Sequence, residues 1–228
     1  MAIQKVGVIG CGLMGHGIAQ VAAQSGCTVI VRESAQGALD KGMARISKSL
    51  AKMVSKEKMT AAQADETEGR LTGTLDLADL ADCDLVIEAI IEDLEIKTSL
   101  YKELGALCKP ETIFASNTSS FPVATMGEAS GRPDKMVGLH FFNPVQLMKL
   151  VEVVRTPATS VESFEAAKAF GKAVGKAPVG AADTPGFIVN RLLVPYMAEA
   201  MRLVERGDAT PEDVDTAMKL GCGYPMGP

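Results

Sequence analysis

Two histidines, His16 and His140, are the only imidazole groups in the chain, and one of them has a carboxylate nearby in the sequence. His140 ends a predicted apolar strand, and Glu152 follows twelve residues later in an apolar segment where an unpaired charge is costly. A carboxylate that holds one imidazole nitrogen lets the other nitrogen accept a proton near neutral pH. The pair could therefore remove a proton from a substrate, or it could be a buried ion pair that joins two strands. Spacing alone does not choose between these interpretations.

A glycine-rich turn between the first strand and the first helix matches the spacing Gly-x-Gly-x-x-Gly. The first glycine makes the turn, the second lets the backbone approach a pyrophosphate, and the third packs the helix on the strand. The N-terminus of the helix then faces the diphosphate. The pattern predicts a dinucleotide site, with a merely packed turn as the alternative. It consists of Gly10, Cys11, Gly12, Leu13, Met14 and Gly15, and His16 just after it is expected to be structural or close to the cofactor.

An acidic residue, Glu33, ends the second predicted strand 18 residues beyond Gly15. A carboxylate at this place can hold both hydroxyls of the adenosine ribose and repels a 2′-phosphate, which favours NAD over NADP. Arg32 could favour the phosphate, but alternation along a strand turns its side chain to the other face. If Glu33 were only a solvated strand end, the protein would show no preference between the two cofactors.

Oxidation of an alcohol with NAD needs a base for the hydroxyl proton and a group that holds the oxygen. Ser119 follows another predicted strand and could hydrogen-bond that oxygen, although turns and helix caps are the commoner role of such serines. Asn190, on a helix of the C-terminal part, could reach across a cleft or could face solvent.

The net charge of −5, from 23 basic and 28 acidic side chains, argues against polyanion binding through bulk positive charge. One segment has the opposite sign, and Lys48, Lys52 and Lys56 in it share a helix face. A phosphorylated carrier such as the nucleotide end of coenzyme A fits this charge, and a solvated helix face is the alternative. Nucleic acid is less favoured because no aromatic residue lies among the lysines. The segment contains Lys41, Arg45, Lys48, Lys52, Lys56 and Lys58 against Glu57 alone.

The five cysteines lack the spacing of a metal site and are expected to be reduced thiols. The N-terminus lacks the pattern of a signal peptide, and no apolar run approaches the ~18 residues that span a bilayer. We therefore expect a cytoplasmic protein without a bound metal and without a membrane partner.

Strands and helices alternate in the first part of the chain, which predicts a doubly wound α/β domain with a parallel sheet. The predicted strands are 5–9, 28–31, 85–89, 113–116 and 136–140. A helix over 38–56 and a second helix that begins after Thr60 form an inserted pair, at about 36–70. After about residue 185 the pattern is helical, and the chain of 228 residues ends in a turn-like sequence.

Taken together, five segments closely resemble the L-3-hydroxyacyl-CoA dehydrogenase family, and especially its short bacterial members that act on 3-hydroxybutyryl-CoA. The likeness extends over essentially the whole chain and implies a Rossmann-type fold. The segments are Val8 to Gly15, Ile87 to Glu92, Ala115 to Ser120, Gly138 to Pro144 and Asp183 to Arg191.

The resemblance implies reversible oxidation of an (S)-3-hydroxyacyl-CoA to the 3-ketoacyl-CoA with NAD. His140 would be the base and Glu152 its partner, and Ser119 and Asn190 would lie by the reacting oxygen. Further residues would hold the cofactor or coenzyme A. For the cofactor these are Glu92, Lys97, Ser119 and Asn143, and for coenzyme A they are Ser49 and Lys56, with Lys52 on the same helix.

The resemblance also implies the domain organisation and a homodimer. Residues 1–184 would form the NAD-binding domain, and 185–228 would begin a helical dimerisation and substrate domain that continues further in family members. Two alternatives remain open. One is a dehydrogenase of the same fold that oxidises a sugar acid, and the other is a nucleotide-binding fragment without turnover.

Overall fold

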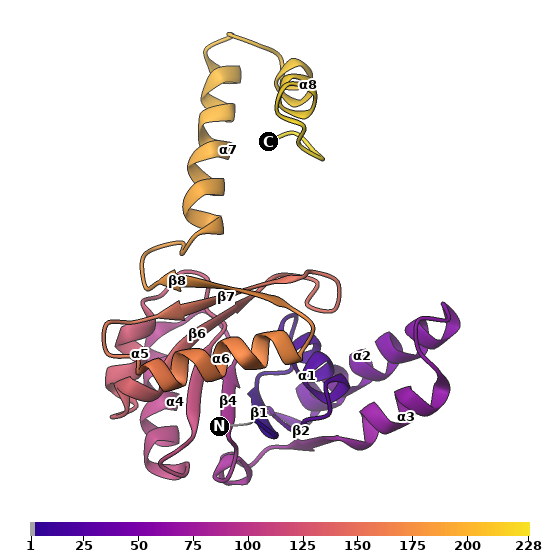
Figure 1. Ribbon diagram of the computed structural model, residues 1–228, viewed down its shortest axis with the longest axis vertical. Helices are drawn as coiled ribbons and strands as arrows, with labels where there is room; N and C mark the ends of the chain where they lie inside the picture. Colours follow the sequence, from indigo (N-terminus) through magenta and orange to yellow (C-terminus); the bar gives the residue numbers. More distant parts are fainter. Residues whose placement is uncertain (1–2) are drawn as a thin grey trace. The chain divides into compact units, whose positions relative to one another are not determined.

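The computed structural model describes residues 3–228 and divides into two compact units. The larger unit ends at Thr184, and the smaller one comprises Pro185–Pro228 (Figure 1). Each unit has its own architecture and is described by itself.

An eight-stranded sheet in the order β3-β2-β1-β4-β5-β6-β7-β8 organises the larger unit. Strands β1 to β6 are parallel, whereas β7 runs antiparallel to β6 and β8 runs parallel to β7. The predicted doubly wound parallel sheet is confirmed. The strands are β1 (Lys5–Ile9), β2 (Thr28–Arg32), β3 (Leu71–Thr74), β4 (Leu85–Glu88), β5 (Ile113–Ser116), β6 (Met136–Phe141), β7 (Leu150–Arg155) and β8 (Ala177–Ala182).

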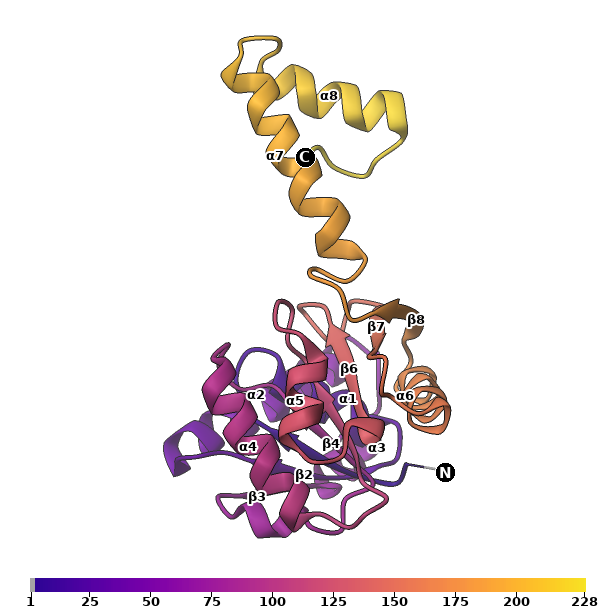
Figure 2. The same cartoon turned by 90° about the vertical axis from the view of Figure 1, so that its left-hand side faces the viewer.

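Helices cover both faces of this sheet, because the strand order reverses direction between β1 and β4. Helices α1 (Gly15–Gln24) and α6 (Val161–Ala173) pack into one core with the apolar side chains of β1, β2 and β7. Helices α4 (Leu94–Leu107) and α5 (Val123–Ala129) cover the opposite face, as Figures 1 and 2 show. Two short 3₁₀ helices, η1 (Leu77–Leu80) and η2 (Pro133–Lys135), lead into β4 and β6.

The predicted helical pair is inserted between β2 and β3 and extends away from the sheet (Figure 1). It consists of α2 (Gln36–Ser55) and α3 (Ala61–Gly69). Leu39, Ile46 and Leu50 anchor α2 in the core that contains α1. The capping box predicted at Thr60 is confirmed, since its hydroxyl accepts from Gln63 N–H and the Gln63 side chain accepts from Thr60 N–H. Helix α2 was expected to include Lys56, but it ends at Ser55 and Lys56 is the capping residue that follows.

The smaller unit is a pair of helices, α7 (Val189–Glu205) and α8 (Pro211–Cys222). Thr210 caps α8, because its hydroxyl accepts a hydrogen bond from Asp213 N–H at 3.1 Å. Pro211 in the first helical position needs no hydrogen bond to its nitrogen, which suits a helix start. The helical character predicted for this part of the chain is confirmed.

Candidate active site

The carboxyl ends of the parallel strands meet along one edge of the sheet. The register aligns Ile9 with Arg32 and with Glu88, and it aligns Ser116 with Glu88 and with Gly138. The loops that follow these strands therefore start side by side. In sheets of this kind, ligands bind at this edge, where the strand order reverses.

His140 and Glu152 face each other on neighbouring strands, since the antiparallel register of β6 and β7 pairs these two residues directly. His140 Nδ1 lies 2.7 Å from Glu152 Oε2, and both side chains are buried. An ionised carboxylate only accepts hydrogen bonds, so Nδ1 carries the proton and proton acceptance falls to Nε2. The Phe142 ring lies against the imidazole, with 4.6 Å between the ring centroids. The strand register thus orients the imidazole for acid–base chemistry.

The glycine turn opens α1 and leaves room for a ligand at its second glycine. Gly10 has a φ of +89°, and a side chain there would collide with the carbonyl of Ala89. A side chain at Gly12 would meet no protein atom within 4 Å. Among residues 3–228, no group accepts a hydrogen bond from Leu13 N–H or Met14 N–H. Open space and unused donors at a helix N-terminus fit the pyrophosphate of NAD.

Glu33 lies against this turn, and its Oε1 accepts a hydrogen bond from Cys11 N–H at 2.5 Å. Its other oxygen accepts from Ser34 N–H at 3.2 Å. The turn therefore holds the carboxylate at the end of β2, where a ribose is expected. The Cys11 thiol stays protonated, because burial and the charge of Glu33 raise its pKa to about 12 against a small opposing effect of Arg45.

Arg32 lies apart from Glu33. Its side chain lines a hollow with Ile96 and Leu100 of α4, on the sheet face opposite to α1. This placement agrees with the expected alternation along β2 and keeps the guanidinium from the carboxylate that would hold the ribose.

Glu92, Lys97 and Ser119 form one connected group. Glu92 Oε1 accepts hydrogen bonds from Ser119 N–H at 3.0 Å and from the Thr118 hydroxyl at 2.9 Å. Lys97 Nζ lies 3.1 Å from the other oxygen of Glu92 and is itself buried. Burial alone would raise the pKa of Glu92, but the Ser119 hydrogen bond, the Lys97 charge and the Thr118 hydroxyl outweigh it and lower the pKa.

Three residues at this edge were not singled out from the sequence. Glu88 ends β4 and is completely buried, Asn117 follows β5, and Lys176 precedes β8. Asn117 Oδ1 accepts from Phe141 N–H at 2.9 Å, which ties the Ser119 loop to the strand of His140. Lys176 Nζ donates to the carbonyls of the loop that contains Asn143, at Val145 and Met148. Glu88 could have been found in the same way as Glu152, because it is an acidic residue at the end of an apolar segment, where an unpaired charge is costly.

Of the remaining predicted residues, one lies at this edge, and four lie on or next to helices. Asn143 is exposed on the loop after β6. Lys52 and Lys56 are exposed on and just after α2, and Ser49 on the same helix is half-buried. The side-chain amines of Lys52 and Lys56 make no hydrogen bond or ion pair with any residue from 3 to 228. Asn190 belongs to α7 in the smaller unit and is described with that unit alone.

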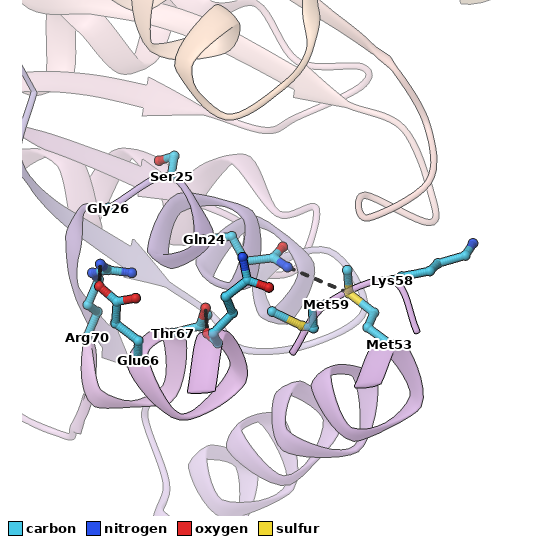
Figure 3. Close-up of a pocket in the computed structure, with 10 residues that line it drawn as sticks. Gln24, Ser25, Gly26, Met53, Lys58, Met59, Glu66, Thr67 and Arg70 are labelled. Carbon is cyan, nitrogen blue, oxygen red and sulfur yellow. Dashed lines mark hydrogen bonds and ion pairs between the residues drawn. The ribbon is translucent and has the colours of Figure 1, made fainter. Parts of the chain in front are cut away.

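A second hollow, of about 440 Å³, lies between the ends of α1 and α2 and the helix α3 (Figure 3). Several of its polar groups are paired within the protein, since Arg70 bonds to Glu66 and Gln24 donates to the sulfur of Met53. None of the predicted site residues lines it. Within residues 3–228, no helix is long and apolar enough to cross a membrane, and no group of acidic, histidine and cysteine side chains could hold a metal ion.

Comparison with protein families identifies both parts of the chain. Residues 5–184 match the model described as "3-hydroxyacyl-CoA dehydrogenase, NAD binding domain". Residues 186–228 match the model described as "3-hydroxyacyl-CoA dehydrogenase, C-terminal domain". Together the two matches cover nearly all of the sequence.

Individual relatives agree with these matches. The mitochondrial hydroxyacyl-coenzyme A dehydrogenase of Homo sapiens is 51% identical, over 99% of this chain and 74% of the relative. A probable 3-hydroxybutyryl-CoA dehydrogenase of Deinococcus radiodurans is 52% identical, over 98% of this chain and 80% of its own length. The crystal structure of (S)-3-hydroxybutyryl-CoA dehydrogenase from Ralstonia eutropha superposes with a TM-score of 0.96 at 39% identity, covering 99% of this chain and 80% of that one.

Proposed function

The chain belongs to the 3-hydroxyacyl-CoA dehydrogenase family, and from this premise we propose that it interconverts an (S)-3-hydroxyacyl-CoA and the 3-ketoacyl-CoA with NAD. The proposed substrate is 3-hydroxybutyryl-CoA, which is the substrate in the names of several relatives. The observation that carries the proposal is the buried contact of 2.7 Å between His140 and Glu152 at the carboxyl edge of a dinucleotide-binding sheet.

In this proposal His140 is the base. Its Nε2 takes the hydroxyl proton of the substrate, and Glu152 stabilises the imidazolium that forms. NAD, when bound, supplies the acceptor for the hydride that leaves the carbon bearing the hydroxyl. Ser119 and Asn190 hold the reacting oxygen, which becomes the ketone oxygen. In the reverse direction, His140 returns the proton to that oxygen.

The cofactor site that we propose is made of the glycine turn together with Glu33, Glu92, Lys97, Ser119 and Asn143. Its support is the open space at Gly12 and the hydrogen bond that fixes Glu33 against the turn. For coenzyme A we propose Ser49, Lys52 and Lys56, whose support is the exposed positive charge of α2. This arrangement favours an acyl-CoA over a sugar acid, which carries no nucleotide, and assigns no role to nucleic acid.

We also propose a homodimer of the complete protein, in the cytoplasm. Large apolar side chains exposed on the two helices of the smaller unit support the dimer, with Leu192 on α7 70% exposed and Leu220 on α8 82% exposed. The cytoplasmic location is supported by the five cysteines, all of which are free thiols. Size measurement by light scattering tests the dimer.

The decisive experiment follows NADH absorbance while the protein is mixed with acetoacetyl-CoA. We expect NADH to be consumed with acetoacetyl-CoA, and NADH to be formed when 3-hydroxybutyryl-CoA and NAD are supplied for the opposite direction. Binding of NADH without any change in absorbance would instead identify a nucleotide-binding protein without turnover. Turnover of a sugar acid in place of the thioester would identify the other alternative.

A further inference from the structure

Glu88 is completely buried at the end of β4, and every polar contact of its carboxylate leads toward the candidate site. One oxygen accepts hydrogen bonds from Ile90 N–H at 2.8 Å and from Lys97 Nζ at 2.5 Å. The other oxygen accepts from the Ser116 hydroxyl at 2.7 Å.

A buried ion pair such as Glu88–Lys97 is a costly way to stabilise a fold. The amine is 1% exposed and the carboxylate 0% exposed, so both groups have lost their water. Attraction between such charges roughly offsets this loss, and apolar side chains of similar volume often stabilise a protein more. The pair does, however, fix the positions of both charged groups.

The first route from Glu88 to the site runs through Lys97. Lys97 bonds to Glu88 from one side and to Glu92 from the other, at 2.5 and 3.1 Å. Glu92 in turn accepts the hydrogen bond from Ser119 N–H. The amine is thus shared by a buried and a half-exposed carboxylate, and its position fixes the second of them.

The second route runs through Ser116, the last residue of β5. Its hydroxyl donates to Glu88 and accepts a hydrogen bond from Thr118 N–H at 3.1 Å. The backbone adds a third link, because Asn117 N–H donates to the carbonyl of Glu88 at 2.9 Å. Glu88 therefore contacts the start of the turn directly and reaches Ser119 N–H through Lys97 and Glu92.

We propose that Glu88 is a positioning residue: with Lys97 and Ser116 it fixes the turn of residues 116–119 and the carboxylate of Glu92, and so sets the place of Ser119 for the reaction. The inference rests on the proposed function, since Ser119 acts there on the reacting oxygen. Lys97 then acts through Glu92. The competing explanation is that the pair only holds α4 against β4.

The first test replaces Glu88 with Gln, which keeps the volume of the side chain. The amide cannot neutralise Lys97, and its NH₂ group competes with Thr118 N–H for the Ser116 oxygen. We expect kcat with acetoacetyl-CoA to fall about tenfold or more, because misplacing a reacting group by about 1 Å can cost about 10²-fold. The Kd of NADH should rise, and the KM of acetoacetyl-CoA should change by less than about threefold, since the thioester carrier binds elsewhere.

The second test compares a residue at the carboxyl end of β5 with the residue that precedes its amino end. Ser116→Ala removes a buried hydroxyl at the carboxyl end of β5, whereas Thr112→Val removes a buried hydroxyl just before its amino end, where it donates to Cys83 O at 2.7 Å. Thr112→Val loses one buried hydrogen bond and Ser116→Ala loses two, so both melting temperatures should fall, that of Ser116→Ala somewhat more. We expect kcat to fall about fivefold in Ser116→Ala and less than about twofold in Thr112→Val, because only the first touches the site.

Several outcomes would overturn the inference. In folded Glu88→Gln enzyme, kcat and NADH affinity within twofold of the wild type would leave Glu88 with a structural role only. If Glu88→Gln does not fold, equal kcat values for Ser116→Ala and Thr112→Val would likewise indicate that Glu88 and Ser116 have a structural role only. A wild-type protein that binds NADH without consuming it would refute the proposed function instead, and the effect of Glu88→Gln on the Kd of NADH would still test the positioning of Glu92.

Discussion

The carboxyl edge of the sheet and the lysine-bearing face of α2 carry charge in opposite ways. At the edge, Glu88, Lys97 and Glu92 are held by hydrogen bonds of 2.5 to 3.1 Å, and two of them are buried. At the end of α2, Lys52 and Lys56 are exposed, and the side-chain amine of neither bonds to any other described residue. Fixed positions of the groups determine the chemistry that the edge can perform, whereas the proposed role of the α2 face depends on its electrostatic field, which salt screens within about 8 Å at physiological ionic strength.

The largest effect that would separate the two regions is expected at His140. His140→Gln should lower kcat about 10³-fold, because general acid–base catalysis contributes about 10²–10⁴-fold. NADH affinity should stay unchanged, and the loss should be independent of salt. Stopped-flow NADH absorbance and fluorescence titration measure the two quantities. Loss of NADH binding together with turnover would make His140 a structural residue.

Charge reversal on α2 should act on substrate binding and leave the chemical step unaffected. Lys52→Glu combined with Lys56→Glu should raise the KM of acetoacetyl-CoA about 30-fold at low salt, since a field of this kind changes association by about 10–10³-fold. The effect should shrink as salt rises, and it should be absent with a truncated thioester that lacks the nucleotide.

The matched control changes the net charge equally at Lys102 of α4 and Lys172 of α6, both exposed. Lys102→Glu with Lys172→Glu should leave the KM nearly unchanged. Equal KM increases in both double variants would remove the proposed role of α2.

A smaller effect is expected at Glu33. Like the charged groups at the edge of the sheet, its carboxylate is held in place by a hydrogen bond, which comes from Cys11 N–H. Glu33→Ser should reduce the preference for NAD over NADP about tenfold, since one charge repulsion of about 1 kcal/mol or slightly more is removed. The ratio of kcat/KM for the two cofactors measures it. An unchanged ratio would mean that Glu33 does not contact the ribose.

The smallest effect concerns the stability contributed by Glu92. Its pKa is lowered in the folded chain, so its ionised form favours folding above the unfolded pKa, and this contribution is lost as pH falls through the folded pKa. Glu92→Gln should therefore melt lower than the wild type near neutral pH, by a few degrees at most for a half-exposed group. The difference should begin to shrink below the usual glutamate pKa of about 4.3 and should vanish once the pH lies below the lowered pKa of folded Glu92. A difference that grows on acidification would contradict this sign.

Five of the six parallel strands could be predicted from the sequence because they are apolar runs bounded by glycine and helix-capping signals, whereas β3, with two threonines and a glycine among its four residues, was not predicted. Strand β8 was not predicted. Its sequence, Ala177–Ala182, contains proline and glycine and lies mostly exposed at the edge of the sheet, so neither apolar content nor alternation identifies it.

The site was predictable where one residue type carries the chemistry, as with His140 and the glycine turn. Glu88 and Asn117 escaped because their roles depend on partners. Glu88 meets Lys97 nine residues away through the start of α4, and Asn117 meets Phe141 across the pairing of β5 with β6. Such partners follow from strand register and helix placement, which a single sequence determines only after the fold is known.

The antiparallel turn between β6 and β7 gives His140 and Glu152 a contact of low sequence separation. Only the short loop after Phe141 has to close for the two side chains to meet, so the entropy of loop closure is small compared with that of the parallel crossovers elsewhere in the sheet. The pair is therefore expected to survive a circular permutation that opens the chain between α2 and α3, because both residues would stay on one continuous hairpin.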